Sequence, residues 1–178
     1  MFTLRPNLPQ ALAKAEQTVP NEPVDWLKHP PHNAHRLDRT VQLPDRASIT
    51  ECGSALLNWE VHRLAGLRTL ASGPAQPGAT VVLGMRMGPA WAVAPCRVIE
   101  AVQTEQLVAF SYTALPGHPE AGTERFAFVR DERGARFEVS AVSRHVFWGS
   151  RLVPFLANFV QGQATEKYLR AGHSLVND

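Results

Sequence analysis

The amino-acid sequence predicts an α+β fold in which a curved antiparallel sheet of about seven strands wraps around a long C-terminal helix. Patterns typical of β-strands follow one another, separated by short turns, from residue 67 to residue 146. An amphipathic helical pattern follows them and begins near Ser150. Because a twisted sheet with one apolar face must bury that face, we expect this helix to cover it.

Length and composition favour one globular domain. The chain has 178 residues, of which 44% are hydrophobic and 19% charged, which suffices for a buried core. Its formal net charge of +2 is small, and the charges form no long runs, so the sequence does not indicate binding to nucleic acid. No segment reaches the roughly 18 apolar residues of a membrane span, and no signal peptide is visible, so we expect a cytoplasmic protein.

A proline-rich arm, residues 1–37, precedes the predicted domain at 38–178. Half of the 14 prolines lie within the first 44 residues, and one short helix is expected near Ala11 to Gln17. Histidines recur at positions 29, 32 and 35, a spacing that could bring imidazoles together on a helix. The prolines at positions 30 and 31 disfavour that helix, so we expect a solvated loop without a metal ion. Cys52 and Cys96 belong to no paired motif and are predicted to be buried, reduced thiols.

A strand at Arg39 to Leu43 precedes the first strong helix signal. Ser48 and Glu51 form a capping-box pattern at its start, Ile49, Cys52, Leu56 and Trp59 form its apolar stripe, and Gly66 ends it. Six further strands are expected at Leu67 to Ala71, Ala79 to Met87, Ala90 to Val102, Gln106 to Thr113, Glu124 to Arg130 and Ala135 to Val146.

The last predicted element is long and amphipathic. Its apolar side carries Leu152, Phe155, Leu156, Phe159 and Gln163 at helical spacing. Pro154 fits the first turn, where a missing amide proton costs little, and Gly162 permits close packing.

The concentrated site candidate is the polar, turn-rich segment between the strands that end at Thr113 and begin at Glu124. His118, Glu120 and Glu124 supply groups able to transfer protons, while prolines and glycines fix the turn. The same residues would also suit a rigid, hydrogen-bonded hairpin without chemistry. We expect Tyr112, His118, Glu120, Glu124 and Arg125 to form one hydrogen-bonded cluster.

Other side chains complete a possible binding cavity between the sheet and the C-terminal helix. Glu124 and Arg125 are neighbours on a strand, so only one of them faces inward. Arg97 and Arg144 could each provide an inward cation for an anionic ligand group, or form outward salt bridges. The ligand-binding candidates are Trp59, Trp91, Arg97, Tyr112, His118, Glu124, Arg125, Arg144, Phe155, Phe159 and Gln163, although the aromatic members could equally fill a solid core.

Residues 110–126 read Phe-Ser-Tyr-Thr-Ala-Leu-Pro-Gly-His-Pro-Glu-Ala-Gly-Thr-Glu-Arg-Phe. This run resembles the hallmark of an uncharacterised bacterial and plant family, domain of unknown function nineteen-ninety. Four other segments match the family pattern in the same order: those around Trp59, Pro95 to Val98, Ser143-Arg144 and Gln161 to Leu169. The resemblance therefore spans roughly residues 38 to 171. The chain departs from the family pattern at Thr113-Ala114, where the family usually has Gly-Thr, and at Thr123, which replaces a carboxylate. The element order is similar to the START-like, birch-pollen-allergen-like superfamily, which implies a helix-grip fold and a hydrophobic ligand.

Three functions remain open at this point. The leading hypothesis is a protein that binds a small hydrophobic or amphipathic molecule. The second is a cyclase, hydrolase or isomerase that uses His118 with Glu120 or Glu124 as an acid/base pair. The third is an interaction module whose arm contacts a partner. No cofactor is implied, since the nucleotide-binding and nucleophile-elbow motifs are missing from the sequence.

Overall fold

The computed structural model describes residues 2–20, 25–145 and 165–176. An 8-stranded antiparallel sheet has the order β2-β8-β7-β6-β5-β4-β3, and β1 pairs with β5 beside this path. The strands are β1 (Phe2–Thr3), β2 (His35–Gln42), β3 (Arg68–Ala71), β4 (Thr80–Met87), β5 (Ala90–Gln103), β6 (Leu107–Ala114), β7 (Glu120–Asp131) and β8 (Gly134–His145). The helices are α1 (Leu8–Glu16), α2 (Ile49–Leu57), α3 (Glu60–Leu64) and a C-terminal helix at residues 165–174.

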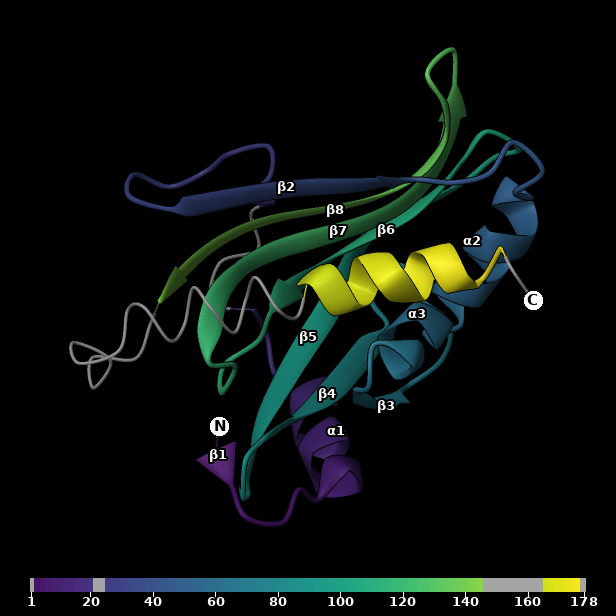
Figure 1. The fold of residues 1–178 in the computed structure, drawn as a ribbon. Helices are drawn as coiled ribbons and strands as arrows, with labels where there is room; N and C mark the ends of the chain where they lie inside the picture. The colour runs from purple at the N-terminus through teal and green to yellow at the C-terminus, as the bar shows by residue number, and fades with distance from the viewer. Residues whose placement is uncertain (1, 21–24, 146–164, 177–178) are drawn as a thin grey trace.

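The predicted α+β architecture with a curved antiparallel sheet is confirmed (Figure 1). Alternating apolar residues fixed most strand positions to within a few residues, because one face of each strand is buried. A register shift between Val98 and Glu100 interrupts the pairing of β5 with β6, and such an irregularity bends a long strand. β7 begins at Glu120 rather than Glu124, so Glu120 belongs to a strand and not to the preceding turn.

The inner face of the sheet carries the main core, beneath α2, α3 and the C-terminal helix (Figure 1). Phe110, Phe126, Phe128 and Phe137 on β6, β7 and β8 are fully buried there. Tyr168, Leu169 and Ala171 of the C-terminal helix join the same cluster. Burying such aromatic side chains removes large apolar areas from water, which is the main stabilising contribution to the fold.

The predicted single helix from Ser48 to Gly66 is divided into α2 and α3. Ser48 Oγ accepts a hydrogen bond from the Glu51 amide at 3.3 Å, as the capping pattern predicted. Trp59 then adopts a left-handed backbone with φ of 67°, which ends the first helix. Its indole Nε1 donates to the Gly73 carbonyl at 2.9 Å, so tertiary contacts hold the ring in place.

The outer face of the sheet is covered by α1, which comes from the segment predicted as an arm. Leu8, Leu12 and Ala15 of α1 pack against Val82, Val93 and Leu115. β2 also begins at His35, within that segment, and pairs with β8. The proposed boundary at residue 37 remains a prediction, but parts of the arm on both sides of residues 21–24 lie against the sheet.

The first part of the predicted C-terminal helix, including Leu152, Phe155, Leu156, Phe159 and Gln163, lies outside the described residues. The prediction that this stripe faces the sheet therefore stays a prediction. Within the described part, Gly172 packs so closely on β8 that an added Cβ would overlap the ring of Phe137. A glycine at this position allows the helix and the sheet to approach each other.

Candidate functional site

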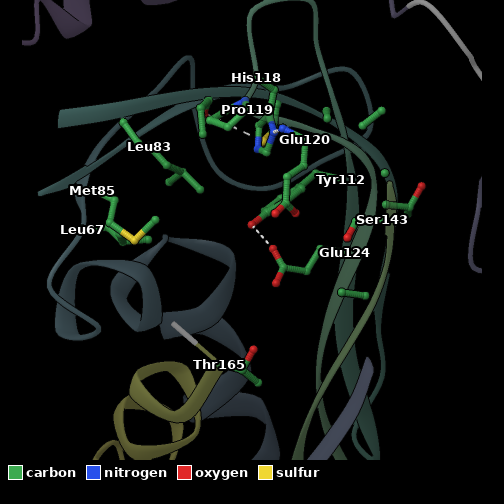
Figure 2. A pocket seen from close by; sticks show the side chains of 18 of the residues that line it. Leu67, Leu83, Met85, Tyr112, His118, Pro119, Glu120, Glu124, Ser143 and Thr165 are labelled. Carbon is green, nitrogen blue, oxygen red and sulfur yellow. Dashed lines mark hydrogen bonds between the residues drawn. The ribbon is translucent and has the colours of Figure 1, made fainter. Parts of the chain in front are cut away.

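A pocket of about 270 Å³ lies between the inner face of the sheet and the start of the described C-terminal helix (Figure 2). Aliphatic and sulfur-containing side chains of β4 and β5 form one wall, including Leu83, Met85 and Cys96. β6, β7 and β8 form the other walls. The polar lining residues among those described are Tyr112, His118, Glu120, Thr123, Glu124, Ser143, Thr165 and Tyr168.

Tyr112 and Glu124 form the central polar pair of this pocket. They are directly opposed on β6 and β7, and Tyr112 Oη donates to Glu124 Oε2 at 2.6 Å. Alternation along each strand aims both side chains inward, together with Phe110 and Phe126. The short distance is typical of a strong hydroxyl–carboxyl hydrogen bond.

Burial dominates the electrostatics of this pair. It raises the pKa of Glu124 to about 7, although the hydrogen bond from Tyr112 opposes that rise. Burial and the nearby Glu124 carboxyl also raise the pKa values of Tyr112 and Tyr168 well above the ordinary value for phenols. At neutral pH, both phenols therefore keep their hydrogen, while the carboxyl exchanges between its charged and neutral forms.

His118 lies in the β6–β7 turn and borders the same pocket (Figure 2). Its Nδ1 accepts a hydrogen bond from the Glu120 amide at 2.9 Å, which leaves the hydrogen of the neutral ring on Nε2. Burial lowers the pKa of this imidazole to about 4. His118 is therefore neutral at pH 7 and can donate a hydrogen bond, but it is a weak base.

The structure brings Tyr112, His118, Glu120 and Glu124 to one pocket, but it does not bring Arg125 there. Arg125 lies on the outer face, where its Nη1 is 4.0 Å from Glu138 Oε2. The predicted five-residue cluster therefore loses Arg125, because adjacent strand residues point to opposite faces. Ligand binding by the other four residues stays a prediction.

The other two candidate cations also lie away from the pocket. Arg97 Nη2 donates to the carbonyls of Ala15, Glu16 and Thr18 at 2.9, 3.3 and 3.2 Å, so it caps the C-terminal end of α1. The guanidinium of Arg144 lies 5.6 Å from the centre of the Trp26 ring. No lysine or arginine lines the pocket among the described residues.

Two aromatic residues that the sequence suggested as ligand contacts, Trp91 and Trp59, do not line the pocket. Trp91 lies on the outer face, with the guanidinium of Arg68 4.4 Å from its ring centre. Trp59 is buried in the core, where its ring meets those of His62 and Phe110. The remaining candidates, Phe155, Phe159 and Gln163, lie outside the described residues.

Sequence reasoning did not select Cys96, Thr165, His62 or Met85 as site residues. Met85 and Cys96 alternate with outward residues on β4 and β5, and this period could have placed them on the inner face. His62 lies behind the pocket wall, and its ring is 5.1 Å from that of Tyr168 and 4.7 Å from that of Phe126. Nothing in the local pattern distinguished this buried histidine from an exposed one.

The donor set suits proton transfer or hydrogen bonding better than metal binding. Within residues 2–20, 25–145 and 165–176, no group of three or more His, Cys, Asp or Glu side chains is placed to hold a metal ion. The described part of the chain also contains no helix long and apolar enough to cross a membrane.

A family model described as Domain of unknown function (DUF1990) matches residues 18–171. The chain belongs to this family. The resemblance inferred from residues 110–126 is thus confirmed, and the match extends further toward the N-terminus than the sequence pattern suggested. A UPF0548 protein of Deinococcus radiodurans is 28% identical over 194 aligned residues, which cover 96% of each chain.

Solved structures show the same helix-grip fold. An uncharacterized protein from Rhizobium leguminosarum aligns with a TM-score of 0.59 and 15% identity, over 82% of this chain and 95% of the other. Ara h 8.0201 aligns with a TM-score of 0.57 and 9% identity, over 81% and 98%. The di-domain ARO/CYC StfQ from the steffimycin biosynthetic pathway aligns with a TM-score of 0.61 and 7% identity, over 81% and 51%. At these identities, the likeness concerns the fold alone.

Proposed function

We propose that this DUF1990 protein binds a small, mainly apolar molecule that carries one neutral or cationic hydrogen-bonding group. The observation that supports this most directly is the Tyr112–Glu124 pair in an otherwise largely apolar pocket. Apolar walls supply affinity, while a few fixed polar groups orient a ligand. The likeness in fold to a di-domain ARO/CYC from a biosynthetic pathway agrees with a small organic ligand.

The polar residues of the pocket indicate which chemical group the polar end of that ligand carries. The sequence suggested a polar or anionic group, with Arg97, Arg144 and His118 as the available polar anchors. Both arginines lie elsewhere, no lysine or arginine lines the pocket among the described residues, and His118 is neutral at pH 7, so an anion would lie beside the carboxyls of Glu120 and Glu124. A hydroxyl or an amine instead matches a carboxyl, a phenol and a neutral imidazole.

A thermal-shift series tests this assignment with alcohols, amines and carboxylic acids of equal chain length. Binding to the folded state raises the melting temperature, by about 5–10 °C at a ligand concentration about 100 times Kd. We expect shifts with long-chain alcohols and amines and smaller shifts with the acids. Equal or larger shifts with the acids would contradict the polar preference.

A matched pair of variants locates the ligand. Ala94→Phe places a ring in the pocket and should abolish the shifts, whereas Ala13→Phe adds the same ring on the exposed side of α1 and should preserve them. Near-ultraviolet circular dichroism shows whether each variant keeps native packing. If Ala94→Phe stays folded and still gives the full shifts, the ligand binds elsewhere.

Acid/base catalysis is the second candidate, because the pKa of Glu124 near 7 suits a group that both accepts and donates a proton at neutral pH. In this case Glu124, not His118, is the proton carrier, since the pKa of His118 is lowered to about 4. A compound that binds should then exchange a carbon-bound hydrogen for deuterium in heavy water. Glu124→Gln should stop the exchange while binding persists. An unchanged exchange rate in that variant would show that Glu124 does not carry the proton.

A further inference from the structure

Two large apolar side chains are exposed at one edge of the sheet. Phe2 is 54% exposed and Leu4 is 74% exposed, and both belong to β1 or directly follow it. Phe2 also lines the pocket. A side chain that borders the pocket and reaches solvent marks a place where the pocket opens, so the apolar lining continues onto the surface at β1.

The position of β1 explains this exposure. β6 pairs with β5 only from Cys96 onward, and β1 occupies the edge of β5 beyond it, opposite Ala92 and Trp91. The neighbouring β4–β5 hairpin turns at Gly88. We call β1, Leu4, Arg5 and this hairpin the β1 edge (Figure 1).

The same part of the molecule is strongly basic. Residues 2–15 and 64–99 contain Arg5, Lys14, Arg68, Arg86 and Arg97 but no Asp or Glu, although the whole chain has a net charge of only +2. Ion pairs within the described residues include none of Arg5, Lys14, Arg68 and Arg86. An anionic partner would therefore meet positive charge that is not neutralised locally.

The strand register places these cations close to β1 on the outer face of the sheet, whereas Phe2 points to the pocket on the inner face. Arg86 is opposite Trp91 on β5, and Trp91 is opposite Thr3 of β1. Arg68 stacks on the Trp91 ring, while Arg5 and Lys14 border a groove of about 340 Å³ between α1 and β5. Exposed apolar side chains with basic residues around them are typical of proteins that insert into the interface of an anionic bilayer.

We propose that the β1 edge docks on a membrane surface rich in anionic phospholipid. Phe2 and Leu4 enter the interfacial region, Arg5, Lys14 and Arg86 lie over the headgroup phosphates, and the pocket opens toward the lipid. A nucleic acid would match the cations but not two exposed apolar side chains at the edge of an apolar pocket. Membrane docking does not require a ligand in the pocket, so it can be measured independently of the proposed ligand binding.

The experiment is co-sedimentation of the full chain with vesicles of phosphatidylcholine, either alone or with about 30% phosphatidylglycerol. We expect binding to the mixed vesicles, little binding to the neutral ones, and weakening as salt rises. Arg86→Glu should weaken binding at least about fivefold, since each cation near an anionic surface contributes about that factor. Leu4→Ser should weaken it about tenfold through lost apolar burial.

Matched controls lie away from the β1 edge. Arg133→Glu makes the same change of net charge in the β7–β8 hairpin, and Leu64→Ser removes an apolar side chain that is 48% exposed on α3. Both should bind as the wild type does. Absence of sedimentation, equal binding to both vesicle types, or equal loss with the control variants would overturn the proposal. So would a dimer in size-exclusion chromatography that Leu4→Ser dissociates, because the apolar pair would then be a self-association surface.

Discussion

Tyr112 and Glu124 oppose each other on neighbouring strands and share a hydrogen bond of 2.6 Å inside the pocket. Two effects on the carboxyl therefore compete. Burial raises its pKa, while the bond from the phenol stabilises the charged form and lowers the pKa, and the net value of about 7 shows that burial dominates. The pocket consequently changes its charge near neutral pH.

Glu124→Gln should remove a pH dependence of stability. In the folded state the carboxyl keeps its proton up to about pH 7, whereas the unfolded chain loses it near pH 4.5. Stability from the neutral carboxyl is thus fully present below the unfolded pKa and declines as pH rises toward 7. Relative to the variant, the free energy of unfolding of the wild type should fall by up to about 3 kcal/mol between pH 4.5 and pH 8. Urea unfolding at each pH would measure this difference.

Glu132→Gln is the control for this measurement, because it makes the same chemical change at an exposed position of the β7–β8 hairpin. Its difference from the wild type should stay nearly constant with pH. A constant difference for Glu124→Gln as well would show that the carboxyl has the same pKa in the folded and unfolded chains.

Tyr112→Phe should raise the pKa of Glu124 above about 7, because the donor that stabilises the carboxylate is lost. It should also lower the unfolding free energy by about 1 kcal/mol, the typical net contribution of such a bond. Carbon-13 nuclear magnetic resonance of the glutamate carboxyls would follow the titration directly. An unchanged or lower pKa of Glu124 would show that the hydrogen bond from Tyr112 does not stabilise the charged carboxylate.

The sequence predicted the sheet well because strand periodicity records which side chains are buried. Val81, Leu83 and Met85 alternate with outward residues, and the structure places Leu83 and Met85 on the pocket wall. Inward positions for Tyr112 and Glu124 follow from the same rule, as does the outward position of Arg125.

The sequence failed where tertiary contacts decide the outcome. A capped, apolar stripe indicated one helix through Trp59, but the backbone there is left-handed, and its indole bonds to Gly73 in the loop between β3 and β4. Arg97 resembled an inward anchor because the docking of α1 on the outer face was invisible in local patterns. Its three carbonyl partners belong to a segment about 80 residues earlier.

Arg97→Met should loosen α1 without affecting the pocket. The substitution keeps the apolar stem but removes the donors to Ala15, Glu16 and Thr18. We expect faster amide hydrogen exchange in α1 and a loss of about 1–3 kcal/mol in stability, because hydrogen bonds to a charged donor are lost. Ligand-induced thermal shifts should persist. Their disappearance in a folded variant would restore Arg97 as a ligand anchor.

Gly172→Ala should destabilise the protein, although alanine ordinarily stabilises a helix by about 1 kcal/mol relative to glycine. The added Cβ would overlap the Phe137 ring, so the helix and β8 must separate. Overpacking of this kind costs about 1–3 kcal/mol, which outweighs the gain in helix propensity. Gly73→Ala is the matched control, since its Cβ would meet no atom within 4 Å. Equal stability of the two variants in urea unfolding would contradict the close helix–sheet contact.

His62→Leu should stabilise the protein, most strongly in acid. His62 is completely buried, and neither ring nitrogen has a hydrogen-bond partner among the described residues. An unsatisfied buried polar group costs about 1–3 kcal/mol, part of which is offset by the ring contacts that leucine loses. We expect the free energy of unfolding at pH 7 to rise by about 1 kcal/mol, as urea unfolding would measure.

The acid behaviour of His62 follows from its pKa, which burial lowers to about 3. The unfolded chain takes up a proton below about pH 6.5, whereas the folded protein does not do so until about pH 3, so the wild type loses stability as pH falls between these values. At pH 5 the loss is about 2 kcal/mol, and the advantage of His62→Leu should grow by that amount. The lowered pKa of His118 acts in both proteins and cancels in the comparison. His29→Leu, at an exposed position, should show no such growth. If the advantage of His62→Leu is equal at pH 5 and pH 7, the histidine is protonated equally in the folded and unfolded chains, and its isolation in the aromatic core is disproved.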